Sequence, residues 1–365
     1  MAQLDQFTFF RGRVAEAAIL KALGIGRGDE VAIQAFTCVA VPEGVIGAGA
    51  RPVYVDIAAN RLTMDPADLE RKLTPATRAI VVQHTFGLPT DMAGIARVAA
   101  ARGLPIIEDC AHAVGSTVGG RDVGSLGVAS FYSFEASKPV FVGIGGSAQV
   151  NDAALAEQVR HDYVAYRQPP FGTQAQVLAM YAAHRIAYRP ATFWQVRALF
   201  RRVSGLGLIP GSYNKVETDL APAEDFRRSL GNLQRRLLPG AIARLASDIP
   251  HRRWVAAQYR ARLGAAGLEH PAHDADADPV YGRYPMLAAN KADILRRAPE
   301  FNVEVASWYA TPVHPLEGRA LAAVGYVEGS CPRAEAVTSR VISLPTSALV
   351  TEALIERTVR LFAAA

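Results

Sequence analysis

Short apolar runs alternate with segments of helical periodicity through the first 110 residues. The apolar runs predict strands at 30–34, 52–56, 79–83 and 104–108, and the helical patterns lie at 12–23, 39–48, 66–72 and 92–101. Short strands separated by helices indicate βαβ units and a mostly parallel sheet. Ligands of such sheets bind beyond the carboxyl ends of the strands. We therefore expect Thr37, His84 and Asp109, which each follow a strand, to face one crevice.

The second half of the chain has a different pattern. Helical segments are expected at 174–203 with a break at Pro190, at 223–245 with an interruption at Pro239, and at 252–265; residues 204–222 are rich in glycine and proline and predict a loop. Strands at 281–287 and 341–344 follow, with helices near Asp293 and Thr351. These patterns predict a large α/β domain over residues 1–245, with a basic helical segment at 160–222, and a smaller α+β domain over residues 246–365.

The composition is that of an ordinary globular protein: of 365 residues, 50% are apolar and 20% are charged. No apolar run reaches the roughly 20 residues of a membrane span, and the first residues lack the basic start and apolar stretch of a signal peptide. Cys38, Cys110 and Cys331 have no metal-ligand spacing and suggest no disulfide framework. We therefore expect a cytoplasmic location and no metal site.

The positive charge is concentrated in one segment. The basic residues between positions 160 and 202 are Arg160, Arg167, Arg185, Arg189, Arg197, Arg201 and Arg202. Asp162 is the only acid there, so this segment has a net charge of +6. The whole chain has a net charge of +5, so the residues outside the segment sum to −1. This distribution argues against a nucleic-acid footprint. Three interpretations stay open for the segment: a solvated face over a dimer, which we favour, attraction of an anionic substrate, and contact with an anionic membrane, which we favour least.

Two segments near the middle of the chain carry the chemistry. Residues 108–115 read EDCAHAVG, and residues 130–152 read SFYSFEASKPVFVGIGGSAQVND. The first places Asp109 at the end of an apolar run, and the second places Lys138 between a hydroxyl-rich strand end and a glycine cluster. Pyridoxal 5′-phosphate (PLP) chemistry needs such a pair, because the lysine forms a Schiff base and the acid keeps the pyridine nitrogen protonated.

These segments resemble the DegT/DnrJ/EryC1/StrS family of PLP-dependent sugar aminotransferases. That family shows EDxAQxxG or EDAAHAxG followed by GxxxGSxGDxxxFSFxxxKxxxxGxGG; the counterparts here are 120–127, 131–134, Lys138 and 143–146. The resemblance extends over nearly the whole chain. It implies fold type I of the PLP-dependent transferases, with a seven-stranded, mostly parallel sheet flanked by helices. It also implies a homodimer that moves an amino group from an amino acid, expected to be glutamate, to a keto-sugar, expected to be nucleotide-linked.

The resemblance also implies roles for individual residues. Lys138 matches the Schiff-base lysine, Asp109 the partner of the pyridine nitrogen, and His112 the residue beside the cofactor ring. Each has a simpler interpretation that depends on no cofactor: a lysine on a solvated loop, an acid that caps a helix, and a core histidine. The family pattern favours the cofactor roles of Lys138 and Asp109.

The phosphate and ring contacts depart from the family pattern. Gly12, Arg13 and Ser133 are the phosphate candidates, although Arg11-Gly12-Arg13 stands where most relatives have Ser-Gly-Thr. Cys38 replaces an aromatic residue that stacks on the ring in many relatives.

The neighbouring-subunit loop also departs from that pattern. The Asn-x-Arg loop that reaches the other subunit's cofactor is missing, and Arg227 or Arg228 could replace its cation. His84 and His314 are candidates for the substrate pocket, and loop histidines with no substrate role are an equal alternative.

Three functions were weighed. An aminotransferase is the leading one. A dehydratase of the same family is disfavoured, because those relatives have a histidine in place of the lysine at position 138. A catalytically altered or regulatory protein on this fold, or a PLP enzyme with a non-nucleotide acceptor, stays open because of the departures at the phosphate loop.

Overall fold

A seven-stranded sheet forms the centre of the computed structural model, which describes residues 4, 6–136, 138–189, 192–205, 224–265 and 267–364. Its strands, in spatial order, are β1 (Phe7–Phe9), β10 (Gly146–Val150), β9 (Ala129–Ser133), β6 (Ile106–Asp109), β5 (Thr77–Gln83), β2 (Glu30–Gln34) and β4 (Arg51–Val55). The five strands from β9 to β4 pair in parallel, and β10 is antiparallel to both of its neighbours. The expected α/β fold with a mostly parallel sheet is confirmed.

Helices cover both faces of this sheet. They are α1 (Gly12–Ala22), α2 (Ala40–Ala48), α3 (Pro66–Lys72), α4 (Met92–Arg102) and α5 (Ala153–Tyr163). Alternate strand residues point to opposite faces. Ile33 accordingly packs in one cluster with side chains of α1, α2 and α5, whereas Ala32 packs with side chains of α3 and α4. Burying a side chain such as Ile33 contributes about 1.5–3 kcal/mol, and this double cover makes the strands apolar on both faces.

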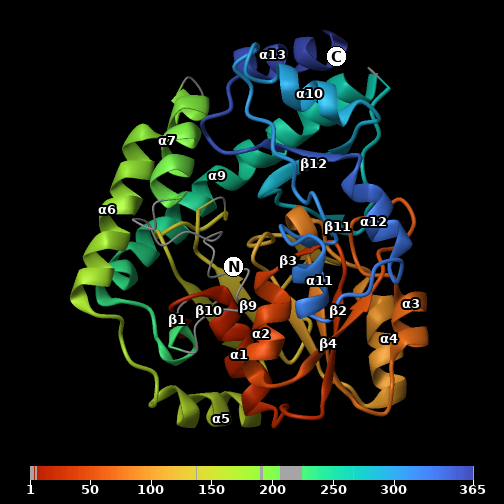
Figure 1. Ribbon diagram of the computed structural model, residues 1–365, viewed down its shortest axis with the longest axis vertical. Helices are drawn as coiled ribbons and strands as arrows, with labels where there is room; N and C mark the ends of the chain where they lie inside the picture. The colour runs from red at the N-terminus through yellow and green to blue at the C-terminus, as the bar shows by residue number, and fades with distance from the viewer. Residues whose placement is uncertain are drawn as a thin grey trace.

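Helix α9 (Asn232–Ala265) runs through two predicted interruptions. The sequence predicts a break at Pro239 and a separate helix from residue 252, but Pro239 and Pro250 both lie inside one helix. This prediction was wrong because it weighed only the backbone hydrogen bond that a proline removes. Packing offsets that loss, since Leu238 is buried on the sheet side and Tyr259 in a second cluster farther along the helix. Figure 1 shows α9 crossing from the sheet layers to the end where α10 and α13 lie.

The C-terminal part forms its own apolar cluster. There β12 (Arg283–Leu287) pairs with β14 (Val341–Pro345), flanked by α10 (Lys291–Arg297) and α13 (Glu352–Ala364). The remaining elements are β3 (Thr37–Cys38), η1 (Thr85–Gly87), β7 (Thr117–Val118), β8 (Arg121–Asp122), η3 (Asp225–Arg227), β11 (Ala277–Asp278), β13 (Val313–His314), α11 (Arg319–Ala323) and α12 (Pro332–Thr338). The domain division at residue 245 stays a prediction, because α9 is continuous across it.

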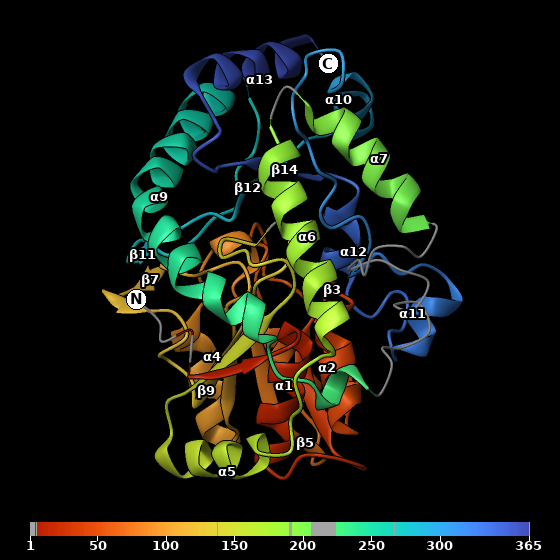
Figure 2. The same cartoon turned by 90° about the vertical axis from the view of Figure 1, so that its left-hand side faces the viewer.

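The basic segment forms two helices, α6 (Phe171–Ala187) and α7 (Phe193–Gly205). In Figure 2, α6 lies between α9 and α7. The ends of α6 and α7 agree with the predicted break at Pro190, which itself lies outside the described residues, as does most of the predicted loop at 204–222. On α6, Val177 is fully buried against Phe10 and Ile144, so this face packs on the protein's own core. Among the described residues, no helix has both the length and the apolar character needed to cross a membrane.

Gly87 allows the turn after β5 to pass close to residue 280. Its φ is +94°, and a Cβ at this position would lie 2.2 Å from the backbone oxygen of Val280. We predict that Gly87→Ala lowers the free energy of unfolding by about 3 kcal/mol, from left-handed strain plus a clash with backbone. Urea denaturation measures the change. Gly24→Ala is the matched control, because its φ is +73° with no atom within 4 Å, and it should cost only about 1 kcal/mol. Equal losses in the two variants would contradict the predicted clash.

Candidate active site

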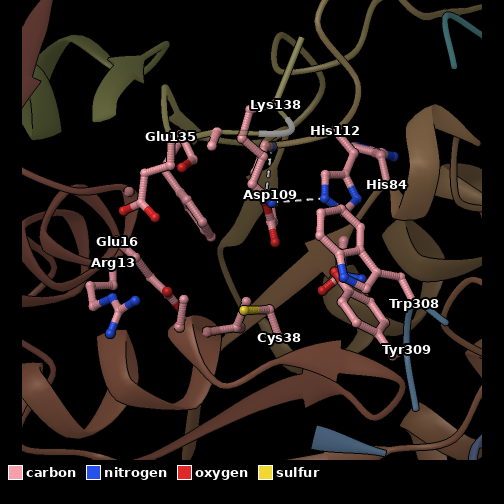
Figure 3. A pocket seen from close by; sticks show the side chains of 18 residues that line it. Arg13, Glu16, Cys38, His84, Asp109, His112, Glu135, Lys138, Trp308 and Tyr309 are labelled. Carbon is pink, nitrogen blue, oxygen red and sulfur yellow. Dashed lines mark hydrogen bonds between the residues drawn. The ribbon is translucent and has the colours of Figure 1, made fainter. Parts of the chain in front are cut away.

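The parallel strands β5, β6 and β9 end at one edge of the sheet, where helix α1 begins. This edge forms a cavity of about 820 Å³, counted together with the solvent at its mouth. The predicted residues that line it are Gly12, Arg13, Cys38, His84, Asp109, His112, Ser133 and Lys138. Small-molecule sites are concave and bring a few polar groups together in an apolar lining. The structure therefore brings eight of the nine predicted site residues together (Figure 3).

Lys138 and His112 are hydrogen-bonded, with 2.8 Å between Nζ and Nε2. Burial, followed by the charges of Lys138 and Arg283, holds the pKa of His112 well below its ordinary value, so the imidazole is neutral. The backbone N–H of Phe86 donates to His112 Nδ1 at 3.2 Å, which assigns the ring proton to Nε2. His112 Nε2 therefore faces Lys138 Nζ, the atom through which a nucleophilic lysine reacts.

Asp109 is a buried acid at the end of β6, and its side chain lines the cavity. Burial raises the pKa of Asp109 above its ordinary value, although a hydrogen bond from the Ala111 N–H (2.9 Å) and the positive charge of Lys138 act in the opposite direction. Residues 111–115 form turns rather than a helix, so Asp109 does not cap a helix. A buried carboxyl of this kind is stabilised as a carboxylate by a cation placed beside it.

The N-terminus of α1 approaches the end of β9 closely. A Cβ on Gly12 would lie 3.1 Å from the Ser133 Cβ, and a Cβ on Gly146 would lie 2.4 Å from the Gly12 backbone nitrogen. The residue before the helix, Arg11, makes no side-chain cap, so the first N–H groups of α1 can face a ligand. Glycine at both positions thus allows a backbone cradle for an anion.

The arginines beside this cradle are already paired. Arg13 forms a buried salt bridge with Glu43, and Arg11 bonds Glu135 at 3.0 Å and Asp225 at 3.3 Å. Arg228, the candidate cation of the missing loop, also pairs with Asp225 and with Glu224. Their charges are therefore shared with acids.

Glu108 precedes Asp109 on β6, and the sequence did not mark it as important. It accepts hydrogen bonds from the backbone N–H groups of Gly124 (2.8 Å), Leu126 and Gly127 (both 2.7 Å). His84 Nε2 lies 3.0 Å from Glu108 Oε2, the oxygen that also accepts from Gly124. His84 Nδ1 accepts from the Thr90 N–H at 3.1 Å. Both ring nitrogens of His84 are thus engaged within the protein, and its ring only borders the cavity.

The remaining predicted residues lie apart from the cavity or at its edge. His314 pairs with Cys38 between β13 and β3, accepts from the Ala310 N–H at 3.2 Å, and is not among the lining residues. Burial lowers the pKa of His314 to about 4. Thr37 is fully buried and donates to Gln83 Oε1 at 2.5 Å, so it does not face the crevice as expected.

Ten of the lining residues were missed. They include Glu16, Glu135, Trp308 and Tyr309. Burial, with the nearby charge of Asp109, raises the pKa of Glu16 well above its ordinary value. Glu16 lies mid-helix among apolar positions, where no sequence signal marks it. The aromatic pair at 308–309 was a detectable signal, because adjacent large aromatics in a loop favour a binding surface.

Comparison with known proteins gives one family. Residues 8–183 and 223–362 match the model of the DegT/DnrJ/EryC1/StrS aminotransferase family. The chain is 37% identical over 214 residues to a UDP-N-acetyl-3-dehydro-α-D-glucosamine 3-aminotransferase from Acidithiobacillus ferrooxidans, a match that covers 54% of this chain and 58% of that relative. It is 29% identical over 332 residues to a pleiotropic regulatory protein from Geobacillus stearothermophilus, covering 89% and 75% of the two chains.

A solved structure shows the same architecture over the whole length. The fold is similar to that of DesV from S. venezuelae, solved in complex with a ketimine intermediate, with a TM-score of 0.72 and 26% identity. The similarity covers 97% of this chain and 83% of that one.

Glu108→Gln should destabilise the protein in a pH-dependent way. Burial by itself raises the pKa of Glu108, but hydrogen bonds from His84, Gly124 and Gly127 outweigh it, so the pKa lies below its ordinary value. The resulting stabilisation is present above the unfolded pKa of about 4.3 and is lost as pH falls through the folded pKa. At pH 7 we predict that Glu108→Gln lowers the free energy of unfolding by about 3 kcal/mol. The glutamine NH₂ group would point at backbone N–H groups, which are donors themselves.

Urea denaturation from pH 7 to pH 3 measures this loss. The difference between wild type and variant should shrink below about pH 4. Glu157→Gln, at an exposed position on α5, is the control and should change stability by less than about 0.5 kcal/mol. If the stability difference between wild type and Glu108→Gln stayed constant across this pH range, the lowered pKa of Glu108 would be contradicted.

Proposed function

The chain belongs to the DegT/DnrJ/EryC1/StrS aminotransferase family, and we propose that it is a PLP-dependent aminotransferase acting on a keto-sugar. The amino donor in this proposal is glutamate, and the acceptor is nucleotide-linked. The observation that carries the proposal is the placement of Lys138, His112 and Asp109 around one cavity. The aminated carbon stays outside the proposal, because the chain spans only 58% of the length of the Acidithiobacillus relative.

The lining residues suit three parts of PLP: its pyridine nitrogen, its phosphate, and its ring with the aldehyde. The buried carboxyl of Asp109 suits a protonated pyridine nitrogen, because a cation there offsets the desolvation of the acid. The backbone cradle at Gly12 and Gly146 suits the phosphate, with Ser133 and Arg13 beside it. Lys138 supplies the amine, and Cys38 supplies a small polarisable contact for the ring.

Bound PLP supplies an electron sink for the bond that breaks at the substrate Cα. Lys138 would hold the cofactor through Nζ and would move a proton to and from the substrate Cα. Asp109 would hold the proton on the pyridine nitrogen. His112 keeps its proton on Nε2, from which it would donate to an oxygen of the bound ligand. Trp308 and Tyr309 add an aromatic wall to the cavity.

A regulatory or catalytically altered protein is the alternative. The Geobacillus relative has a regulatory name, and the Arg11–Arg13 segment departs from the family's phosphate loop. Lys138, His112 and Asp109 together favour catalysis, because they place an amine, an imidazole and a buried carboxyl around one cavity.

We also propose a homodimer in the cytoplasm. The family resemblance implies that the partner subunit completes the cofactor site. The loop predicted at 204–222, most of which lies outside the described residues, and the Arg227-Arg228 pair after it stay our candidates to reach it. The three free cysteines agree with a reducing compartment. An anionic acceptor, rather than a membrane, is the ligand we propose to be attracted by the basic segment.

Lys138→Ala should abolish transamination, because no other group supplies the amine and the proton transfer. We expect turnover to fall at least about 10³-fold, together with loss of the visible absorbance band that PLP gives on a protein lysine and that borohydride bleaches. Lys21→Ala, an exposed lysine on α1, is the control and should keep both signals. Near-normal turnover of Lys138→Ala would refute the assignment.

Asp109→Asn should slow the reaction with glutamate by about 10²-fold or more and weaken PLP binding, because a neutral amide does not hold the pyridine proton. Single-turnover absorbance changes and PLP titration measure the two effects. Asp152→Asn, which alters the cap of α5 outside the cavity, is the matched control. If the Asp109→Asn variant kept wild-type kinetics, Asp109 would have no role beyond its turn.

A further inference from the structure

The family match leaves out residues 184–222, yet His184 and Tyr188 at the start of this segment contact Phe141 and Glu304. At the end of α6, the rings of His184 and Tyr188 stack with centroids 4.9 Å apart, and His184 contacts the Phe141 ring at 4.7 Å. Phe141 follows Lys138 by three residues. The beginning of the unmatched segment therefore packs against the loop that carries the lysine.

Tyr188 donates a hydrogen bond to Glu304. Burial, and then the charge of Glu304, raises the pKa of Tyr188 well above its ordinary value, so the phenol remains a donor. The other oxygen of Glu304 accepts from Arg283 Nη1 at 2.5 Å, and both charged residues are only 8% exposed. A buried ion pair requires good geometry and further hydrogen bonds to offset its desolvation. Tyr188 supplies one such bond to the acid.

Arg283 connects this pair to the cavity wall. Its Nε and Nη2 donate to the hydroxyl and the backbone oxygen of Ser343, both at 3.0 Å, so its guanidinium has a defined orientation. In that orientation it lies over the Trp308 ring, 5.7 Å from the centroid. Trp308 is in turn parallel to the His112 ring, within 7° at 6.4 Å, and His112 bonds Lys138.

We propose that Tyr188 is a positioning residue: through Glu304 and Arg283 it holds Trp308 in the wall of the active site, and it thereby governs how the acceptor fits. The inference rests on the proposed function for its substrate, since a flat indole suits the ring of a sugar better than the chain of glutamate. The segment that the family model omits thus contributes to the specificity of this chain.

Amide hydrogen exchange tests the positioning part without any substrate. The Ala306 N–H donates to the backbone oxygen of Ser343 at 3.0 Å, and this same oxygen accepts from Arg283. In Tyr188→Phe we expect the peptide that covers residues 303–312 to exchange about tenfold faster, as the loss of one hydrogen bond to a charged group predicts. Unchanged exchange in a folded variant would overturn the proposal.

Tyr181→Phe is the matched control. Tyr181 lies on the same helix and accepts a hydrogen bond from Arg244 at 3.2 Å, outside the Glu304 cluster. It should leave exchange at 303–312 unchanged. Equal acceleration in both variants would show that any loosening of α6 has the same effect, and would also overturn the specific role of Tyr188.

The kinetic arm separates substrate fit from catalysis. With UDP-N-acetyl-3-dehydro-glucosamine as the probe acceptor, Tyr188→Phe should raise the acceptor KM about fivefold to tenfold while kcat and the glutamate half-reaction change less than about twofold. A fall in kcat at constant KM would contradict it. If wild-type protein shows no half-reaction with glutamate, the proposed function fails, while the exchange experiment still decides whether Tyr188 positions the wall.

Discussion

The position of Asp109 depends on the carboxylate that precedes it. Adjacent strand residues point to opposite sides, so Glu108 and Asp109 at the end of β6 cannot share an environment. Glu108 points into the protein, where three backbone N–H groups and His84 satisfy it. This interaction joins β6 to the 124–127 turn and to the end of β5. Because these hydrogen bonds hold Glu108 in place, Asp109 projects into the cavity at a defined position.

The arginines beside the cavity are paired, whereas burial raises the pKa of two of its acids. Arg11 and Arg13 form ion pairs with acids, which limits the cost of burying them. Burial raises the pKa of Asp109 at the end of β6 and of Glu16 on α1. Such a region favours a ligand that brings positive charge. The electrostatics therefore agree with a cofactor whose pyridine nitrogen is protonated at Asp109.

Much of the fold could be predicted because its signals are local. Strand β2 and helix α3 have the predicted bounds, and the ends of β4 and α4 differ from the prediction by one residue. The long helix α9 was mispredicted because its two prolines are locally unfavourable. Contacts with two apolar clusters outweigh them, and those contacts involve residues distant in the sequence.

The sequence by itself determined the α/β class, the edge of the sheet where ligands bind, and the identity of Lys138 and Asp109, because strand periodicity and the family pattern are properties of neighbouring residues. The tertiary structure decided what surrounds them. The hydrogen bond from Phe86 that assigns the proton of His112 depends on the turn after β5 meeting the turn after β6. The contacts of Tyr188 with Glu304, and of Arg283 with Trp308, join elements that no spacing rule relates. Periodicity reports which face of an element is buried, whereas the partner on that face is chosen only when the chain folds.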